Sequence, residues 1–356
     1  MRGRWATACL AASLFLALGA RGAPLLVHEF MADLGRGPVL VRYLYVAEWW
    51  DDYRLIPTTP ESGVGTLAPL EEMARTRAAT AAVNANFFDP ATGLPVGLLI
   101  RDGIVERANH GRRAALGIDL LGRLVFFHPQ VSLYVRSGEG KVAVDDVNRP
   151  IRTDELVLYT ESYVETIAPS PSQMLRVVRI HKGQVVGAGN ERDPVPDGSA
   201  SLLVASGAAR TRIAFLSVGD EAAPGYDLDE GPLLITDAVS AGPLLVDEGR
   251  DALDLAAEGF DPDSALARGL AARSVLATDW TGGLLLLTVT KDATSVGADF
   301  WDLVAILQRL PTPVRSAIAF DGGHSSSLVL REGAGYRELG SGGEVAVGLL
   351  LVPKGR

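Results

Sequence analysis

Cysteine is nearly absent from this chain. The single cysteine among 356 residues is Cys9, inside an apolar run from Trp5 to Leu18 that follows a basic start. The run is too short for a membrane span, and small residues from Gly19 to Ala23 follow it, so the pattern predicts a secretory signal peptide over residues 1–23. A lipoprotein cysteine would follow the run instead of lying inside it. The mature protein would then fold without a disulfide in an oxidising compartment.

Positive charge and long apolar runs are also scarce. The formal net charge is −10, and it falls to about −13 once Arg2, Arg4 and Arg21 leave with the signal. Such a chain is poorly suited to nucleic acid or to an anionic membrane as its main partner. No later apolar run reaches spanning length without a charge, so we expect an exported protein, periplasmic or secreted. Residues 24–356 show no linker of disordered composition, which predicts one domain.

Several familiar chemistries lack their motifs. There is no Walker loop, no dinucleotide-binding glycine fingerprint and no paired-histidine zinc helix. The five histidines, at positions 28, 110, 128, 181 and 324, are scattered, so neither a metal site nor a cofactor is predicted. Gly323 to Ser327 looks like a serine-hydrolase elbow, but a strand follows Ser325 and no histidine comes after it. The elbow interpretation therefore fails.

What the chain does contain is many short β-rich runs separated by turn residues. Examples lie at Leu40 to Ala47 and Leu175 to Ile180, and helical spacing recurs from Thr66 to Thr80 and around Phe300 to Leu310. The predicted fold class is therefore α+β: a large mixed, mostly antiparallel sheet with a few packed helices. The stretch from Leu255 to Leu270 is expected to be an insertion, and could serve as a flap over a site.

The most informative segment runs from Asp321 through Gly322, Gly323 and His324 to three serines, Ser325 to Ser327. An apolar strand that stops on a carboxylate places it at a sheet edge, where ligands are usually met. The two glycines allow backbone N–H groups to approach an anion or a sugar closely. A tight β-turn is the structural alternative, but an acid, a histidine and three hydroxyls in seven residues favour a functional site.

Other candidates remain open between structural and functional interpretations. Asn84 and Asn86 follow a buried strand and suit sugar hydroxyls, although they also suit a turn with Phe87 and Phe88 in the core. Arg273 opens an apolar run, so it either binds an anion or pairs with an acid such as Asp279 or Asp321. Gly242, before Pro243, breaks two apolar runs where backbone could approach a ligand.

Taken together, these segments resemble the phosphodiester glycosidase family. The resemblance is strongest over residues 79–128 and 238–352. The family's motifs occur here, in the family's order, at Asn84-Ala-Asn86-Phe-Phe, Gly242 to Gly249, Arg273 to Asp279, Asp299 to Ser326 and Val345 to Val352. Four positions depart from the family pattern: Ala85-Asn86 replaces a glycine pair, His324 replaces a glycine and Ser274 replaces a threonine. The first two replacements place bulk or donors where substrate should lie, so they bear on which sugar is accepted more than on the reaction.

The resemblance implies hydrolysis of a sugar-1-phosphodiester on the sugar side, with release of sugar and a phosphomonoester. Breaking the C1–O bond builds positive charge on the sugar and needs a nearby carboxylate, for which Asp321 is the best candidate. Arg273, the Gly322 and Gly323 amides and the Ser325 or Ser326 hydroxyl would hold the phosphate. The remaining expected substrate-binding residues are Asn84, Asn86, Gly242, Asp279 and His324.

Two rival functions remain. A non-catalytic carbohydrate-binding protein on the same scaffold would bind sugar without forming product. A metal-dependent phosphodiesterase would cut P–O and would need carboxylates near Asp321, with Asp279 and Asp89 as the obvious recruits. The sequence leaves the sugar, the aglycone, the stereochemistry and the oligomeric state open.

Overall fold

The computed structural model describes residues 12–16, 23–109, 111–165, 167, 174–196, 198–231 and 234–355. Cys9 and most of the predicted signal segment lie outside the described residues. The chain forms two compact units. The first unit comprises residues 1–56, 69–85 and 242–356, and the second comprises residues 57–68 and 86–241. The single-domain expectation stays a prediction.

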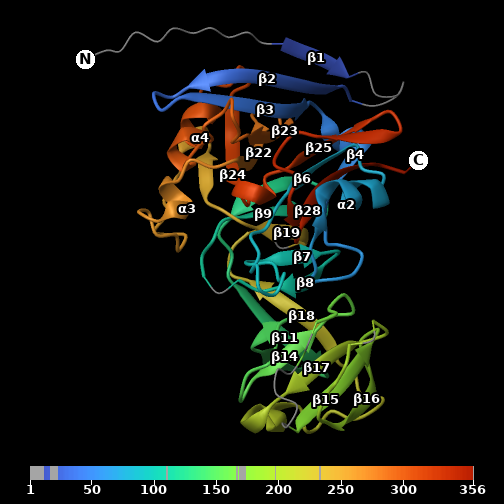
Figure 1. The fold of residues 1–356 in the computed structure, drawn as a ribbon. Helices are drawn as coiled ribbons and strands as arrows, with labels where there is room; N and C mark the ends of the chain where they lie inside the picture. Colours follow the sequence, from blue (N-terminus) through green and yellow to red (C-terminus); the bar gives the residue numbers. More distant parts are fainter. Residues whose placement is uncertain are drawn as a thin grey trace. The chain divides into compact units, whose positions relative to one another are not determined.

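The first unit is built on an eight-stranded sheet in which all neighbouring strands are antiparallel (Figure 1). Its strands, in spatial order, are β1 (Ala12–Leu16), β2 (Leu25–Asp33), β3 (Pro38–Val46), β23 (Leu284–Val289), β22 (Arg273–Asp279), β24 (Val314–Ala319), β20 (Leu244–Asp247) and β21 (Arg250–Asp251). The central strands β22 and β23 are buried on both faces, which explains their near-continuous apolar sequence.

A second, five-stranded sheet and most of the helices complete this unit. The sheet has the order β26 (Gly335–Glu338), β25 (Leu328–Glu332), β6 (Ala81–Asn84), β28 (Gly348–Pro353) and β4 (Tyr53–Thr58). The helical elements are α1 (Trp49–Asp52), α2 (Leu70–Thr76), α3 (Ala265–Arg268), α4 (Phe300–Leu307) and the 3₁₀ turn η2 (Gly323–Ser325). Both helices expected from sequence spacing are present, as α2 and α4, although α2 is shorter than predicted.

The second unit consists of three smaller sheets. The first has the order β10 (Leu124–Phe127), β9 (Ala115–Asp119), β19 (Ile235–Ser240), β7 (Leu99–Arg101) and β8 (Ile104–Arg107). The second contains β12 (Gly140–Val144), β11 (Val131–Ser137) and β18 (Ala223–Leu228). The third contains β13 (Asp146–Val147), β14 (Leu156–Tyr159), β17 (Ser201–Ala205), β15 (Leu175–His181) and β16 (Gln184–Glu191). The second unit also contains η1 (Gly207–Ile213). Of the two remaining short strands, β27 (Glu344–Val345) belongs to the first unit, and β5 (Ala68–Pro69) lies at a boundary between the units.

The predicted mostly antiparallel sheet with few helices is confirmed, but it is divided among several sheets instead of forming one. Among the described residues, strands take up 46% and helices 10%, so this part of the chain is largely β and the α+β class describes it loosely. No helix among the described residues is long and apolar enough to cross a membrane. The stretch from Leu255 to Leu270 is packed, with Leu255, Phe260 and Ala267 buried.

Candidate active site

The register between β22 and β24 brings Arg273 and Asp321 together. Val275 lies opposite Ala319 in this antiparallel pair. Because side chains two residues apart lie on one face of a strand, two further steps place Arg273 opposite Asp321 on the same face. The backbone pairing continues past the end of β24, since the Phe320 N–H donates to the Ser274 carbonyl at 2.9 Å. The cation and the acid singled out from sequence are therefore cross-strand neighbours.

The Arg273 guanidinium is buried and held by backbone oxygens. Its Nε donates to Ala298 O at 2.9 Å, and its Nη2 donates to Leu266 O at 2.8 Å and Gly269 O at 3.0 Å. The guanidinium carbon lies 4.5 Å from the centroid of the Phe300 ring, which adds a cation–π contact. These contacts fix the orientation of the side chain without neutralising its charge.

One nitrogen of this guanidinium is left over. Among the described residues, Nη1 of Arg273 has no acceptor, and no carboxylate lies within ion-pair distance of the side chain. A Cβ built on Gly322 would lie 3.2 Å from Nη1, so Gly322 is needed for the close approach of this nitrogen to the loop. Burial lowers the pKa of Arg273 to about 10, while Asp299, Asp321 and Asp302 act in the opposite direction. The group remains a cation at neutral pH and is placed to bind an anion.

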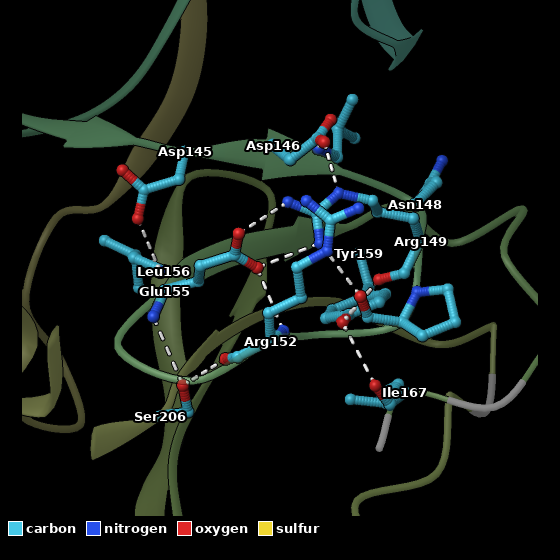
Figure 2. Close-up of polar contacts among 12 residues, drawn as sticks. Asp145, Asp146, Asn148, Arg149, Arg152, Glu155, Leu156, Tyr159, Ile167 and Ser206 are labelled. Atoms are coloured by element: carbon cyan, nitrogen blue, oxygen red, sulfur yellow. Dashed lines mark hydrogen bonds and ion pairs between the residues drawn. The ribbon is translucent and has the colours of Figure 1, made fainter. Parts of the chain in front are cut away.

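Arg149, in the second unit, is a useful comparison because neighbouring acids neutralise its charge (Figure 2). It donates to both oxygens of Glu155 at 2.9 Å and also to Asp146, which is completely buried. Burial lowers the pKa of Arg149, but its two acids raise it further, so the net shift is upward. Arg107 also donates only to carbonyl oxygens, so a missing carboxylate alone does not identify a site. What distinguishes Arg273 is the acid across the strand.

Asp321 is a half-buried carboxyl whose charge changes near neutral pH. Burial raises its pKa to about 6, and the Ser325 hydroxyl, the Gly322 amide and the Arg273 charge lower it only in part. The Gly322 N–H donates to Asp321 Oδ1 at 2.9 Å. A carboxyl with a pKa close to the working pH is suited to act as a base or a nucleophile.

The loop that carries Asp321 is held at both ends by Asn84. The Asn84 amide donates to Asp321 O at 2.8 Å, and its Oδ1 accepts from Ser327 N at 3.0 Å. The Asp321 N–H donates to Ala85 O at 3.0 Å. Asn84 is fully buried, so in this conformation its side chain positions the loop. A sugar hydroxyl would have to share its remaining hydrogen-bonding capacity.

The loop itself offers fewer free backbone donors than its sequence suggests. The Gly322 amide donates to Asp321, and the Gly323 amide donates to Ala272 O at 2.7 Å, so neither is free for a phosphate in this conformation. Of the loop hydroxyls, the buried Ser326 Oγ has no partner among the described atoms. The Ser325 hydroxyl is already hydrogen-bonded to Asp321, so a phosphate would have to share it.

Ser327 and His324 complete the loop. The Ser327 hydroxyl donates to Glu338, an acid that sequence reasoning did not select, because nothing in the sequence links it to the Asp321 segment. His324 is exposed, and its Nδ1 lies so close to Gly343 that any side chain at Gly343 would collide with the imidazole ring.

Of the other predicted residues, one lies near the Arg273–Asp321 pair and another lies far from it. Gly242 precedes Pro243, whose carbonyl accepts from Ala319 N at 3.0 Å, so Gly242 lies beside the end of β24 that leads to the site. Asp279 lies at the opposite end of β22, six residues from Arg273 and roughly 20 Å away at ~3.3 Å per residue. Asp279 is therefore not part of this cluster.

Asn86 belongs to the second unit. Its amide donates to the carbonyls of Val96, Leu98 and Ser240 at 3.2, 3.1 and 2.8 Å, and its buried Oδ1 has no partner among the described atoms. Asp89, the other acid considered for a metal site, is exposed and accepts from Ala91 N. Within the described ranges, no group of three or more His, Cys, Asp or Glu side chains is arranged to hold a metal ion.

Comparison with known proteins bears out the family resemblance. Residues 176–352 match the model of the phosphodiester glycosidase family. The match contains Arg273 and the Asp321 loop but not Asn84. None of the curated proteins matches the sequence.

Three solved structures share the fold. A hypothetical protein from Synechocystis has a TM-score of 0.75 at 22% identity and covers 93% of this chain, which spans only 62% of that structure's length. An exported-protein candidate of Burkholderia pseudomallei has a TM-score of 0.69 at 24% identity, covering 89% of this chain and 74% of its own. The catalytic domain of zebrafish N-acetylglucosamine-1-phosphodiester alpha-N-acetylglucosaminidase, auto-inhibited by its pro-peptide, has a TM-score of 0.55 at 15% identity, covering 97% and 88%.

Proposed function

We propose that this protein is an exported hydrolase that cleaves a sugar-1-phosphodiester at the glycosidic C1–O bond. The observation that carries the proposal is the cross-strand pair of Arg273, a buried cation with an unused Nη1, and Asp321, a carboxyl with a pKa of about 6. The family match over residues 176–352 supports the same reaction class. Export rests on the predicted signal peptide and on the similarity to an exported-protein candidate.

The reaction divides naturally between these two groups. Water supplies a hydroxyl to C1 and a proton to the departing phosphate, so the products are a free sugar and a phosphomonoester. The ionised Asp321 carboxylate acts on the sugar side, either on C1 itself or on the water, and stabilises the positive charge that develops there. The two routes differ in stereochemical outcome.

Arg273 binds the phosphate of the substrate. Its Nη1 and the hydroxyls of Ser325 and Ser326 are the donors that remain free or shareable in the loop. A phosphomonoester leaves with a second pKa of about 6, so the leaving group needs little protonation at neutral pH. A second carboxylic acid, which ordinary glycosidases use to protonate the leaving oxygen, is therefore dispensable.

The test is incubation of the mature protein with a panel of sugar-1-phosphodiesters, assaying reducing sugar and phosphomonoester. The wild type should release both in equal amounts, and Asp321→Asn should release at least a hundredfold less while remaining folded. If both proteins bind the panel and neither releases sugar, the protein is a carbohydrate-binding protein. Activity abolished by a chelator and restored by a divalent cation would instead support the metal-dependent phosphodiesterase.

A further inference from the structure

A cavity of about 400 Å³ opens in the first unit at the end of β22 opposite the Arg273–Asp321 pair. Its lining includes apolar side chains, an indole and polar side chains: Val246, Val314, Trp280, Glu248, Arg250 and Gln308. Pockets of mixed character with a few convergent polar groups are typical ligand sites. The candidate active site contributes no residue to it.

The indole of Trp280 stands on a rigid turn. The neighbouring Asp279 carboxylate accepts from Thr281 N and Oγ1 at 2.8 and 2.7 Å, from Gly283 N at 2.8 Å and from the Tyr45 hydroxyl at 2.8 Å. Burial would raise the pKa of Asp279, but these hydrogen bonds outweigh it and lower the pKa. Trp280 is nevertheless 55% exposed, so the turn holds a large apolar ring in solvent.

The hairpin between β20 and β21 packs against this ring. A Cβ on Gly249 would lie 3.0 Å from the indole Cζ2, and the Arg315 guanidinium carbon lies 5.8 Å from the ring centroid. Arg315 is paired with Glu248 at 2.7 Å. Glu248 has a left-handed φ of 45°, a conformation that is unfavourable for a non-glycine residue. The hairpin therefore supports the Trp280 ring even though Glu248 adopts an unfavourable backbone conformation.

Of the two charged side chains that line the cavity, only the positive one has no ion pair among the described residues. Arg250 is exposed and, among the described residues, forms no ion pair, whereas Glu248 is neutralised by Arg315. Asp247 lies opposite Arg250 in the hairpin, but it does not line the cavity, and its Oδ1 accepts from Ser316 Oγ at 3.3 Å. The cavity lining therefore contains both an exposed indole and a cation without an ion pair among the described residues.

We propose that this Trp280 cavity binds an anionic oligosaccharide. The C–H face of a pyranose ring would stack on the indole, because the negative face of the π system attracts the weakly positive C–H groups. A carboxylate or phosphate on the sugar would pair with the Arg250 guanidinium, and the Gln308 amide would take a hydroxyl. The choice of a saccharide rests on the proposed function: the cavity would hold a part of a polymeric substrate remote from the bond that is cut.

Isothermal titration with three probes tests this: an oligogalacturonate bearing carboxylates, a phosphorylated oligomannose and a neutral cello-oligosaccharide. Trp280→Ala should weaken binding of the anionic probes at least tenfold, while Trp280→Phe should keep most of the affinity because it retains an aromatic face. Arg250→Gln should lower the affinity for the anionic probes to that for the neutral one. The stronger of the two anionic probes identifies the source of the charge.

Two variants serve as matched controls. Trp301, also partly exposed, lies beneath Arg268 at 4.2 Å and outside the cavity, so Trp301→Ala should bind as the wild type does. Arg54 is exposed and without an ion pair among the described residues, so Arg54→Gln controls for charge. Unchanged binding by Trp280→Ala, equal loss with Trp301→Ala, or no binding of any probe overturns the inference.

The titrations need no turnover, so the two proposals can fail separately. If the protein binds these probes through Trp280 but releases no sugar, the proposed function is wrong and the proposed binding site in the cavity stands. If the protein hydrolyses sugar-1-phosphodiesters but binds none of the probes, only the proposed binding site in the cavity is wrong.

Discussion

At the scale of single residues, the site depends on a carboxyl that is costly to keep charged. Burial raises the folded-state pKa of Asp321 from 3.8 to about 6. A raised pKa means that its favourable contribution to folding is complete below the unfolded pKa near 4. That contribution is lost as pH rises through about 6. The ionised form that the proposed reaction requires therefore weakens the fold.

We predict that Asp321→Asn stabilises the protein at pH 8 while abolishing activity. The gain in unfolding free energy should be ~3 kcal/mol, because the amide removes the cost of a buried charge and each unit of pKa shift corresponds to ~1.4 kcal/mol. It should shrink towards zero below pH 4, where the wild-type carboxyl is protonated in both states. Urea unfolding at several pH values measures this. A variant that is less stable at every pH would contradict the shifted pKa.

Arg273 offers a second test at this scale. Replacement by glutamine removes a cation that lowers the pKa of Asp321, so the acidic limb of the kcat/KM profile should move to higher pH. Replacement by lysine keeps the charge but loses the three carbonyl contacts and the stacking on Phe300, so KM should rise at least tenfold.

The control for this prediction is Arg149→Lys. Arg149 is neutralised by Asp146 and Glu155 in the second unit, so its replacement should lower stability without moving the pH profile. If Arg273→Gln leaves the acidic limb where it is in the wild type, the electrostatic coupling between Arg273 and Asp321 is absent.

At the scale of elements, the end of β6 holds the loop that follows β24. Asn84→Ala would leave the Asp321 carbonyl and the Ser327 amide without their partner, at a cost of ~3 kcal/mol for two buried groups. Because the loop would lose its anchors at both ends, kcat should also fall at least tenfold in the fraction that remains folded. Thermal unfolding and initial rates below the melting temperature measure the two effects.

Asn148 provides the matched control, since it is buried in the second unit and also bonds in both directions. Its amide donates to Thr160 Oγ1 at 2.8 Å, and its Oδ1 accepts from Thr160 N at 2.8 Å. Asn148→Ala should lose stability but keep the kcat of the folded protein. Equal loss of kcat in both variants would show that the effect of Asn84 is general destabilisation.

Some of these elements could be predicted from sequence and others could not. The helix at Phe300 and the strand before Asp321 follow from apolar spacing, and the two strands that carry Arg273 and Asp321 were located correctly. The pairing of these two strands could not be predicted, because register depends on contacts between distant segments. The glycine amides looked free in the sequence because an acceptor such as the Ala272 carbonyl has no side-chain signature.

At the scale of the whole molecule, the sequence indicated an antiparallel β-rich protein but not its division. The two units interleave along the chain, with the second formed by residues 57–68 and 86–241. No compositional break marks those boundaries, since each crossing lies within short strands and turns. Asp279 and Asn86 were grouped with Asp321 because their motifs occur in family order. In the structure Asp279 lies at the far end of β22, and Asn86 belongs to the other unit.

The central claim is that the bond cut is C1–O and not P–O. Hydrolysis of a sugar-1-phosphodiester in water enriched in oxygen-18, followed by mass spectrometry of both products, tests it directly. The account predicts that the label enters the released sugar and that the phosphomonoester carries none. Label in the phosphomonoester would contradict it, because water would then have attacked phosphorus.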